Sequence, residues 1–104
     1  MELVRAVYRL SARFPGHERY GLTTQIRRCA ISIPSNIAEG HARRSRKEYF
    51  RYVVIALGSL AELETQMLIA QDLHYVVKLD TRECRNLLEE IGRTLRGLES
   101  ALSA

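Results

Sequence analysis

The chain has 104 residues, of which 46% are apolar and 27% charged, a balance that predicts one globular domain over residues 1–104 and excludes two separate cores. Its two distant cysteines exclude a disulfide framework. We find neither a secretory segment nor an apolar run of membrane-spanning length. We therefore expect a cytoplasmic protein without membrane contact. Residues 1–52 hold 11 Lys and Arg against 4 Asp and Glu, whereas residues 53–104 hold 5 against 8, and this basic half indicates an anionic partner.

The first predicted helix spans Glu2 to Arg13, because apolar residues recur there at steps of three and four. The string Phe14-Pro15-Gly16 ends it, since the residue before proline avoids the helical region. We expect Cys29, on the second helix, and Cys84, on the fourth, to be reduced thiols that face the core.

The second predicted helix spans Thr23 to Gly40, with Thr23 as its N-cap and Gly40 as its C-terminal stop. Pro34 falls inside its apolar stripe. Because proline cannot donate a hydrogen bond to the carbonyl of Ala30, the sequence predicts a kink or a short break in the helix at Pro34.

The third predicted helix spans Arg46 to Leu73 and begins with the capping box of Ser45 and Glu48. It carries two apolar stripes, more than a helix in a monomeric bundle needs. One comprises Tyr49, Val53, Ala56, Leu60, Leu63, Met67 and Ala70, and the other Phe50, Val54, Leu57, Ala61 and Leu68, with Ile55 and Ile69 beyond it. The helix is therefore either central and deeply covered or part of a subunit interface, and we favour self-association.

The fourth predicted helix spans Thr81 to Leu102, with Asp80 as its cap and Glu83 three residues later. No segment shows the alternation of a β-strand. Four helices joined by short turns predict an all-α, up-down four-helix bundle whose second helix is kinked at Pro34.

The sequence shows no catalytic constellation and no metal or cofactor motif, so we expect a protein that binds rather than catalyses. None of its three histidines follows a glutamate by three residues, as a di-iron bundle requires. Three carboxylates, Glu39, Glu62 and Glu64, could form a paired acid site. We favour the alternative, in which they pair with Arg27 or Arg28 across the bundle or across a subunit interface. An enzyme would need one of these glutamates to meet a histidine.

A basic segment precedes and opens the third helix. Four of five consecutive positions are cations, namely Arg43, Arg44, Arg46 and Lys47, and Arg51 follows one turn later. A helix N-terminus has free amides that favour anions, so cations there predict a phosphate-binding surface, which Arg27 and Arg28 could extend. The alternative is a solvated face that only keeps the protein soluble. Phosphate contacts would be independent of sequence and sensitive to salt, and a ring of subunits would multiply them.

Four strings, Tyr20–Thr23, Gln25–Arg28, Ser32–Gly40 and Gly58–Thr65, resemble the signatures of a bacterial four-helix-bundle family. Its founding members are encoded in intervening sequences of 23S ribosomal RNA genes, and the accessory variability protein of diversity-generating retroelements shares the fold. The resemblance implies a homopentamer, nucleic-acid contact through basic surfaces and a protein partner such as a reverse transcriptase. The basic positions that match are Arg27, Arg28, Arg43, Arg44, Arg46 and Lys47.

We interpret Ser35, Asn36 and Glu39 as structural polar residues around Pro34, at a helix or subunit interface. The sequence therefore favours a homo-oligomeric bundle that binds RNA or DNA without sequence preference, as a scaffold or accessory factor. The alternative function is a protein-interaction module with no direct role in nucleic-acid binding.

Overall fold

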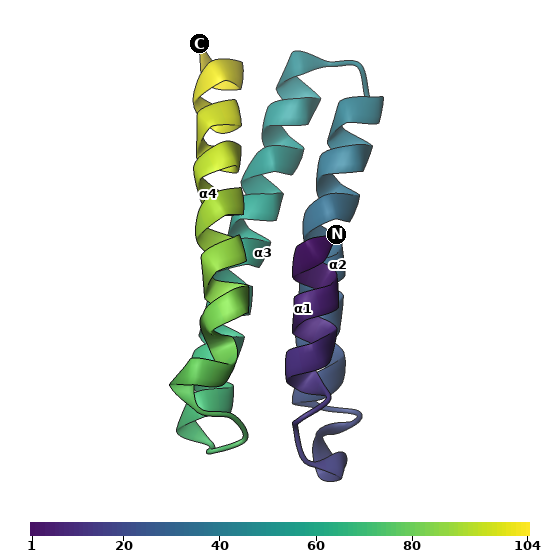
Figure 1. Cartoon of the computed structure of the whole chain (residues 1–104). Helices are drawn as coiled ribbons and strands as arrows, with labels where there is room; N and C mark the ends of the chain where they lie inside the picture. The colour runs from purple at the N-terminus through teal and green to yellow at the C-terminus, as the bar shows by residue number, and fades with distance from the viewer.

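The computed structural model describes all of residues 1–104 and contains four α-helices and no strand. Successive helices run in opposite directions, so the predicted all-α bundle of four helices is confirmed (Figure 1). The α-helices are α1 (Glu2–Ser11), α2 (Leu22–Ala42), α3 (Arg46–Asp72) and α4 (Arg82–Ser103). Two short 3-10 helices, η1 (Gly16–Glu18) and η2 (Lys78–Thr81), lie in the connections at one end.

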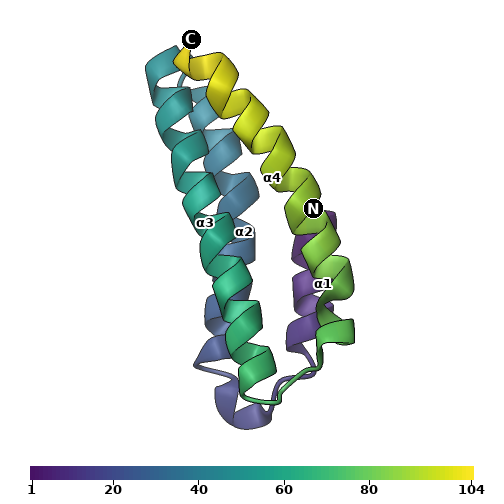
Figure 2. The ribbon, with the colours of Figure 1, turned by 90° about the vertical axis from the view of Figure 1, so that its left-hand side faces the viewer.

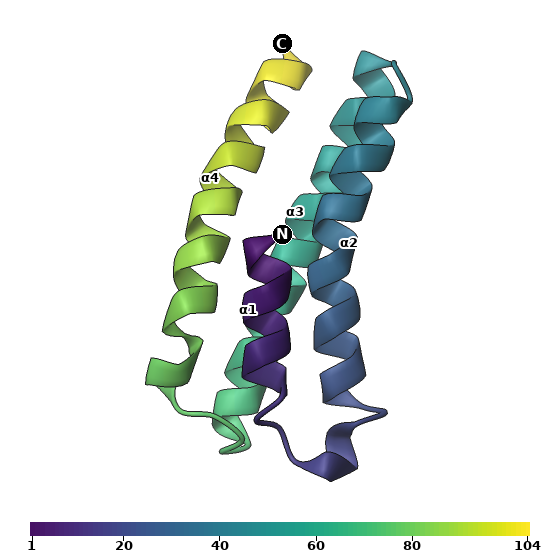
Figure 3. The ribbon, with the colours of Figure 1, turned by 45° about the vertical axis from the view of Figure 1, so that its right-hand side comes forward.

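Helix α1 covers only part of the bundle. It has 10 residues, whereas α2, α3 and α4 have 21, 27 and 22. Its N-terminus lies near mid-height in three views of the molecule (Figures 1, 2 and 3). The bundle therefore has a four-helix half, which contains α1, and a three-helix half beyond Met1, where only α2, α3 and α4 continue.

The core follows the predicted apolar spacing. From α1, Leu3, Ala6, Val7 and Leu10 are buried at steps of three and four residues. The same cluster takes in Ile26, Ala30 and Ile33 from α2 and Leu63, Met67 and Ala70 from α3, and the thiols of Cys29 and Cys84 also face it. Both cysteines are buried and free, as expected.

Helix α2 differs from its predicted bounds at both ends. Thr23 is not its N-cap: the helix begins at Leu22, whose amide N–H donates to Glu18 Oε1 at 3.0 Å. Gly40 does not stop it either, because the helix continues to Ala42. It also continues through Pro34 without a break, since one missing donor leaves the packed neighbouring turns in place.

Of the N-caps predicted for α3 and α4, the first is found and the second is not. Ser45 is the N-cap of α3, and its Oγ accepts the amide N–H of Glu48 at 3.2 Å. The carboxylate of Glu48 lies 3.6 Å from Arg51, so only this half of the capping box is found. Asp80 does not cap α4: its Oδ2 accepts the amide N–H of Val77, inside the 3-10 turn that precedes the helix.

The two apolar stripes of α3 differ in how much of their surface is buried. The first faces the core, where Val53, Ala56 and Leu63 have no exposed surface. The second faces outward only in part: 41% of Val54 and 56% of Leu68 are exposed, with Ile55 and Ile69 beside them, whereas Leu57 is half-buried and packs against the core. The expectation that no apolar run reaches membrane-spanning length is wrong for α3, because one 18-residue window has a mean hydropathy of 1.5, enough by length and composition for a membrane span, and 33% of it is buried. Within this chain, therefore, α3 is not a deeply covered central helix.

Candidate nucleic-acid interface

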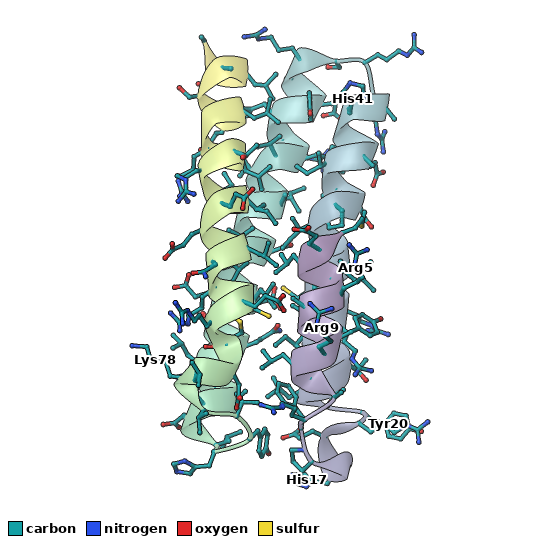
Figure 4. The ribbon with its side chains drawn as sticks, viewed as in Figure 1. Arg5, Arg9, His17, Tyr20, His41 and Lys78 are labelled. Atoms are coloured by element: carbon teal, nitrogen blue, oxygen red, sulfur yellow. The ribbon has the colours of Figure 1, made fainter.

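The turn between α2 and α3 brings five of the seven predicted cations together. These residues, called the basic end below, are Arg43, Arg44, Arg46, Lys47 and Arg51. The chain reverses within three residues after Ala42, which requires a positive φ of 54° at Arg44, and Ser45 then begins α3. His41, labelled near the top of Figure 4, marks this end of the molecule.

Arg27 and Arg28 do not belong to the basic end. Arg43 lies fifteen positions after Arg28 along α2, or about 22 Å at the usual helical rise. Arg27 instead contacts α1: its Nε donates to Ser11 Oγ at 2.7 Å, and its guanidinium lies 4.5 Å from the ring centroid of Tyr8. This residue therefore joins α1 to α2, and the expected proximity of Arg27 and Arg28 to the basic end is wrong.

Arg43 and Arg51 both lie close to the ring of Tyr52, with their guanidinium carbons 5.5 and 5.6 Å from its centroid. Arg43 also donates to Glu39 Oε2 at 2.9 Å and to the Tyr52 hydroxyl at 3.0 Å. Hydrogen bonds from Arg43 and Tyr52 lower the pKa of Glu39 below its ordinary value. The charge of Arg43 is thus compensated, and Arg51 has Glu48 within 3.6 Å.

Arg46 contacts the last turn of α4. Its guanidinium donates to the carbonyl of Leu102 at 3.2 Å, to that of Ala101, and to that of Ala104 at 3.4 Å. Carbonyls at a helix C-terminus have no partner within the helix and carry partial negative charge, so an arginine there stabilises the helix end. Arg46 therefore has a structural role, whatever else it binds.

Arg44 and Lys47 are the two exposed cations of the basic end whose side chains make neither an ion pair nor a hydrogen bond, whereas Arg46 is held by the carbonyls of α4. Beside them, the turn encloses a polar hollow of about 610 Å³, lined by Gly40, His41, Ala42, Arg44, Ser45, Arg46 and Tyr49. The first turn of α3 opens onto this region, and the earliest amides of a helix have no partner within it. Uncompensated cations beside such amides suit an anion of phosphate size.

The sequence analysis placed Tyr49 on an apolar stripe but did not predict the aromatic contacts of this end. Two arginines lie close to the ring of Tyr52, and the ring of His41 lies edge-on to Tyr49 with 5.6 Å between centroids. Gly40 makes this packing possible, since a Cβ there would lie 2.6 Å from the Cβ of Tyr52. The spacing of Tyr49 and Tyr52, three residues apart on one helix face, was the available signal.

The polar residues predicted to be structural have separate roles. Asn36 Nδ2 donates to the carbonyl of Ser32 at 2.8 Å, one turn earlier and beside Pro34. Ser32 Oγ in turn donates to Ser59 Oγ at 2.9 Å and so joins α2 to α3. Ser35 is exposed on α2.

Glu62 accepts a hydrogen bond from Gln66, and Glu64 is exposed without an ion pair. The prediction that these glutamates or Glu39 pair with Arg27 or Arg28 is therefore wrong within the chain, because Arg27 turns toward α1 and Glu39 bonds to Arg43. Pairing across a subunit interface stays a prediction.

The two thiols are not placed for chemistry. Burial raises the pKa of both Cys29 and Cys84 to about 11, so both are neutral at physiological pH. No group of three His, Cys, Asp or Glu side chains comes together that could hold a metal ion.

Comparison with known proteins gives one family. The model of the 23S rRNA-intervening sequence protein family matches residues 1–97 of the chain. This match confirms the family resemblance that the four signature strings indicate. No curated protein matches the chain.

Proposed function

Because the chain belongs to the family of 23S rRNA-intervening sequence proteins, we propose that it is a non-enzymatic, homo-oligomeric bundle protein that binds RNA or DNA without sequence preference. It would act in the cytoplasm as a scaffold or accessory factor, without a metal or cofactor. The basic end would contact phosphate groups and would make no sequence-specific contacts with the bases.

The pair of uncompensated cations, Arg44 and Lys47, carries this proposal. Both are exposed and neither is used in an ion pair; Arg44 lines the polar hollow, and Lys47 lies in the first turn of α3. Arg43 and Arg51 have carboxylates near them, which a phosphate would have to displace. We therefore expect Arg44 and Lys47 to contribute most of the affinity and Arg27 none.

Self-association belongs to the same proposal, and the exposed stripe of α3 supports it. Monomeric proteins rarely leave a contiguous apolar face of this kind in water. A ring, a pentamer by family resemblance, would cover Val54, Ile55, Leu68 and Ile69 and would repeat the basic end around its rim, so that weak phosphate contacts add up. The kink expected at Pro34 also remains part of the proposal, since Pro34 deprives the carbonyl of Ala30 of its usual donor.

The test of nucleic-acid binding is a titration with fluorescent structured RNA and duplex DNA at several salt concentrations. The logarithm of the binding constant should fall linearly with the logarithm of salt, with a slope of about −0.7 to −0.9 per phosphate contacted. Replacing both Arg44 and Lys47 with Gln should abolish most binding. The matched control replaces two other exposed, unpaired arginines, Arg5 and Arg82, with Gln and should bind as the parent does.

Equal losses in the two double variants would contradict a localised site, because both change net charge by the same amount. Absence of binding even at low salt would overturn the proposal and favour the protein-interaction module.

Self-association is tested separately, by sedimentation of a Leu68→Glu variant. This change puts a charge on the exposed stripe of α3, and it should dissociate the oligomer. Leu79→Glu, at an exposed apolar position in η2, is the control and should leave the oligomer intact. A parent protein that sediments as a monomer would overturn this part of the proposal.

A further inference from the structure

The basic end holds one anion that the chain itself supplies, the carboxylate of Glu39. Arg43 Nη2 donates to Glu39 Oε2 at 2.9 Å, and the hydroxyl of Tyr52 donates to the same oxygen at 3.2 Å. These bonds, that from Arg43 first, lower the pKa of Glu39, so the carboxylate is charged at neutral pH. A guanidinium and a hydroxyl that converge on one anionic oxygen are donors that also bind the oxygens of a backbone phosphate.

The contact between Glu39 and Arg43 can be opened at little cost to the fold. About half of each side chain is exposed, 52% for Glu39 and 48% for Arg43. Exposed pairs at positions i and i+4 contribute little to stability, because water and salt screen them. The close approach of α2 to α3 at this level depends on Gly40, which has no side chain to hold Tyr52 away.

The neighbouring cation determines which phosphate can displace Glu39. Arg44 follows Arg43 directly and makes no ion pair, so it can hold one phosphate of a strand while Glu39 stays in place. The next phosphates of that strand then lie close to Arg43, at a high effective concentration. A free phosphate lacks this advantage, whereas Glu39 is fixed on α2 one turn before Arg43. The Arg43 site should therefore open to a strand and stay closed to a single phosphate.

We propose that Glu39 is an internal competitor for a phosphate site formed by Arg43 and Tyr52, and that a nucleic-acid strand held at Arg44 displaces it. In the free protein the carboxylate closes the site, and in the complex a backbone phosphate takes its place while the carboxylate turns to water. The inference rests on the proposed function and assigns to Glu39 the choice of a strand over free phosphate.

The first variant is Glu39→Gln, which removes the charge but keeps an oxygen that can accept the bond from Arg43. Titrated with the fluorescent structured RNA, it should bind about three- to fivefold more tightly than the parent, because an exposed pair no longer has to be broken. The control Glu89→Gln makes the same change in net charge at an exposed position about 20 Å along α4 from Leu102, which Arg46 contacts. That distance exceeds the screening length of about 8 Å, so the control should bind as the parent does.

A second variant, Arg43→Gln, separates competition for Arg43 from simple repulsion of the RNA by Glu39. In the parent it should weaken binding less than about twofold, since most of what Arg43 gains from phosphate it loses from Glu39. In the Glu39→Gln background it should cancel the whole gain. Circular dichroism melts of the three variants check the fold.

Inorganic phosphate tests the choice of a strand. Added at constant ionic strength as a competitor of the labelled RNA, it should have an inhibition constant about threefold lower for Glu39→Gln than for the parent, because the Arg43 site is then open to a single phosphate. Equal inhibition constants would overturn the selection that we assign to Glu39.

The outcomes separate this inference from the proposed function. If the parent binds RNA and Glu39→Gln binds only as Glu89→Gln does, the competitor role is refuted and the nucleic-acid function stands. An equal gain from Glu39→Gln with and without Arg43 would show general repulsion and would refute it as well. RNA binding by Glu39→Gln but not by the parent would support the inference, and absence of binding in both would overturn both proposals.

Discussion

The two halves of the bundle bury the same kind of sequence to different extents. On α4, Leu88 lies in the four-helix half and is buried, whereas three of the four residues that follow on the same stripe, Ile91, Leu98 and Leu102, are half-buried and only Leu95 is buried. On α2, Ile33 is buried and Ile37, one turn later, is not. The difference comes from α1, which covers one half only, so an apolar stripe determines which face turns inward but not how well that face is covered.

This difference also separates stability from binding. The fully buried large side chains, such as Val7, Ile26 and Leu63, are in the well-covered part of the core. The candidate nucleic-acid interface, the basic end, is in the three-helix half. We therefore expect the four-helix half to supply most of the free energy of unfolding.

The largest expected effect is the difference in free energy of unfolding between Leu63→Ala and Ile37→Ala. Leu63 has no exposed surface, so its truncation leaves a cavity and should lower the free energy of unfolding by about 3 kcal/mol. Ile37 is half-buried, so solvent can fill the space, and its truncation should cost about 1 kcal/mol. Urea unfolding followed by circular dichroism measures both, and equal losses would mean that Ile37 is as well covered in solution as Leu63.

The next effect compares two glycines of the three-helix half. A methyl group at Gly40 would lie 2.6 Å from the Cβ of Tyr52, so Gly40→Ala should force α2 and α3 apart and destabilise by about 2 kcal/mol. Gly97 has nothing within 4 Å of the added Cβ, and Gly97→Ala should stabilise α4 by about 0.5–1 kcal/mol. Melting temperatures that move in opposite directions would confirm the close approach at Gly40, and a neutral Gly40→Ala would refute it.

A smaller effect concerns the start of α3, at the tip of the three-helix half. Ser45→Ala removes the acceptor for the amide of Glu48 and should cost about 1 kcal/mol. Ser45→Asp keeps an acceptor at the N-cap and should retain the parent stability. If Ser45→Ala and Ser45→Asp both melt at the parent temperature, the Ser45 cap contributes nothing to the stability of the protein and this end of α3 is frayed.

The smallest effect is a pH dependence at the end of the four-helix half. Glu18 accepts the hydroxyl of Tyr75 at 2.6 Å and the amide of Leu22, and Asp80 accepts the amide of Val77 and pairs with Arg13. These bonds lower both carboxyl pKa values below their ordinary 4.5 and 3.8. The folded state therefore binds these two protons less readily than the unfolded state does.

Their stabilisation is present above those ordinary values and lost as the pH falls through the lowered ones. The melting temperature should accordingly drop below about pH 4.5, and the double variant Glu18→Gln, Asp80→Asn should drop less. Circular dichroism melts between neutral pH and pH 3 measure this, and parallel curves for parent and variant would exclude these two groups as the cause.

Much of this protein follows from the sequence alone, because the features concerned are local. Apolar spacing of three and four residues gave the four helices, the inward face of α4 and the buried positions of Cys29 and Cys84. Ser45 beside Glu48 gave the start of α3, since a cap needs only its own turn. The family follows from the signature strings, and the match over residues 1–97 confirms it.

Only the tertiary structure decided the remaining features, because they depend on which helices meet. Gly40 looked like a helix stop, yet its missing side chain serves the approach of Tyr52 from α3. Arg27 looked like a partner for phosphate or glutamate, yet it bonds to Ser11 on α1. The partly open second stripe of α3 results from which helices lie beside it, and periodicity along one helix does not specify that arrangement.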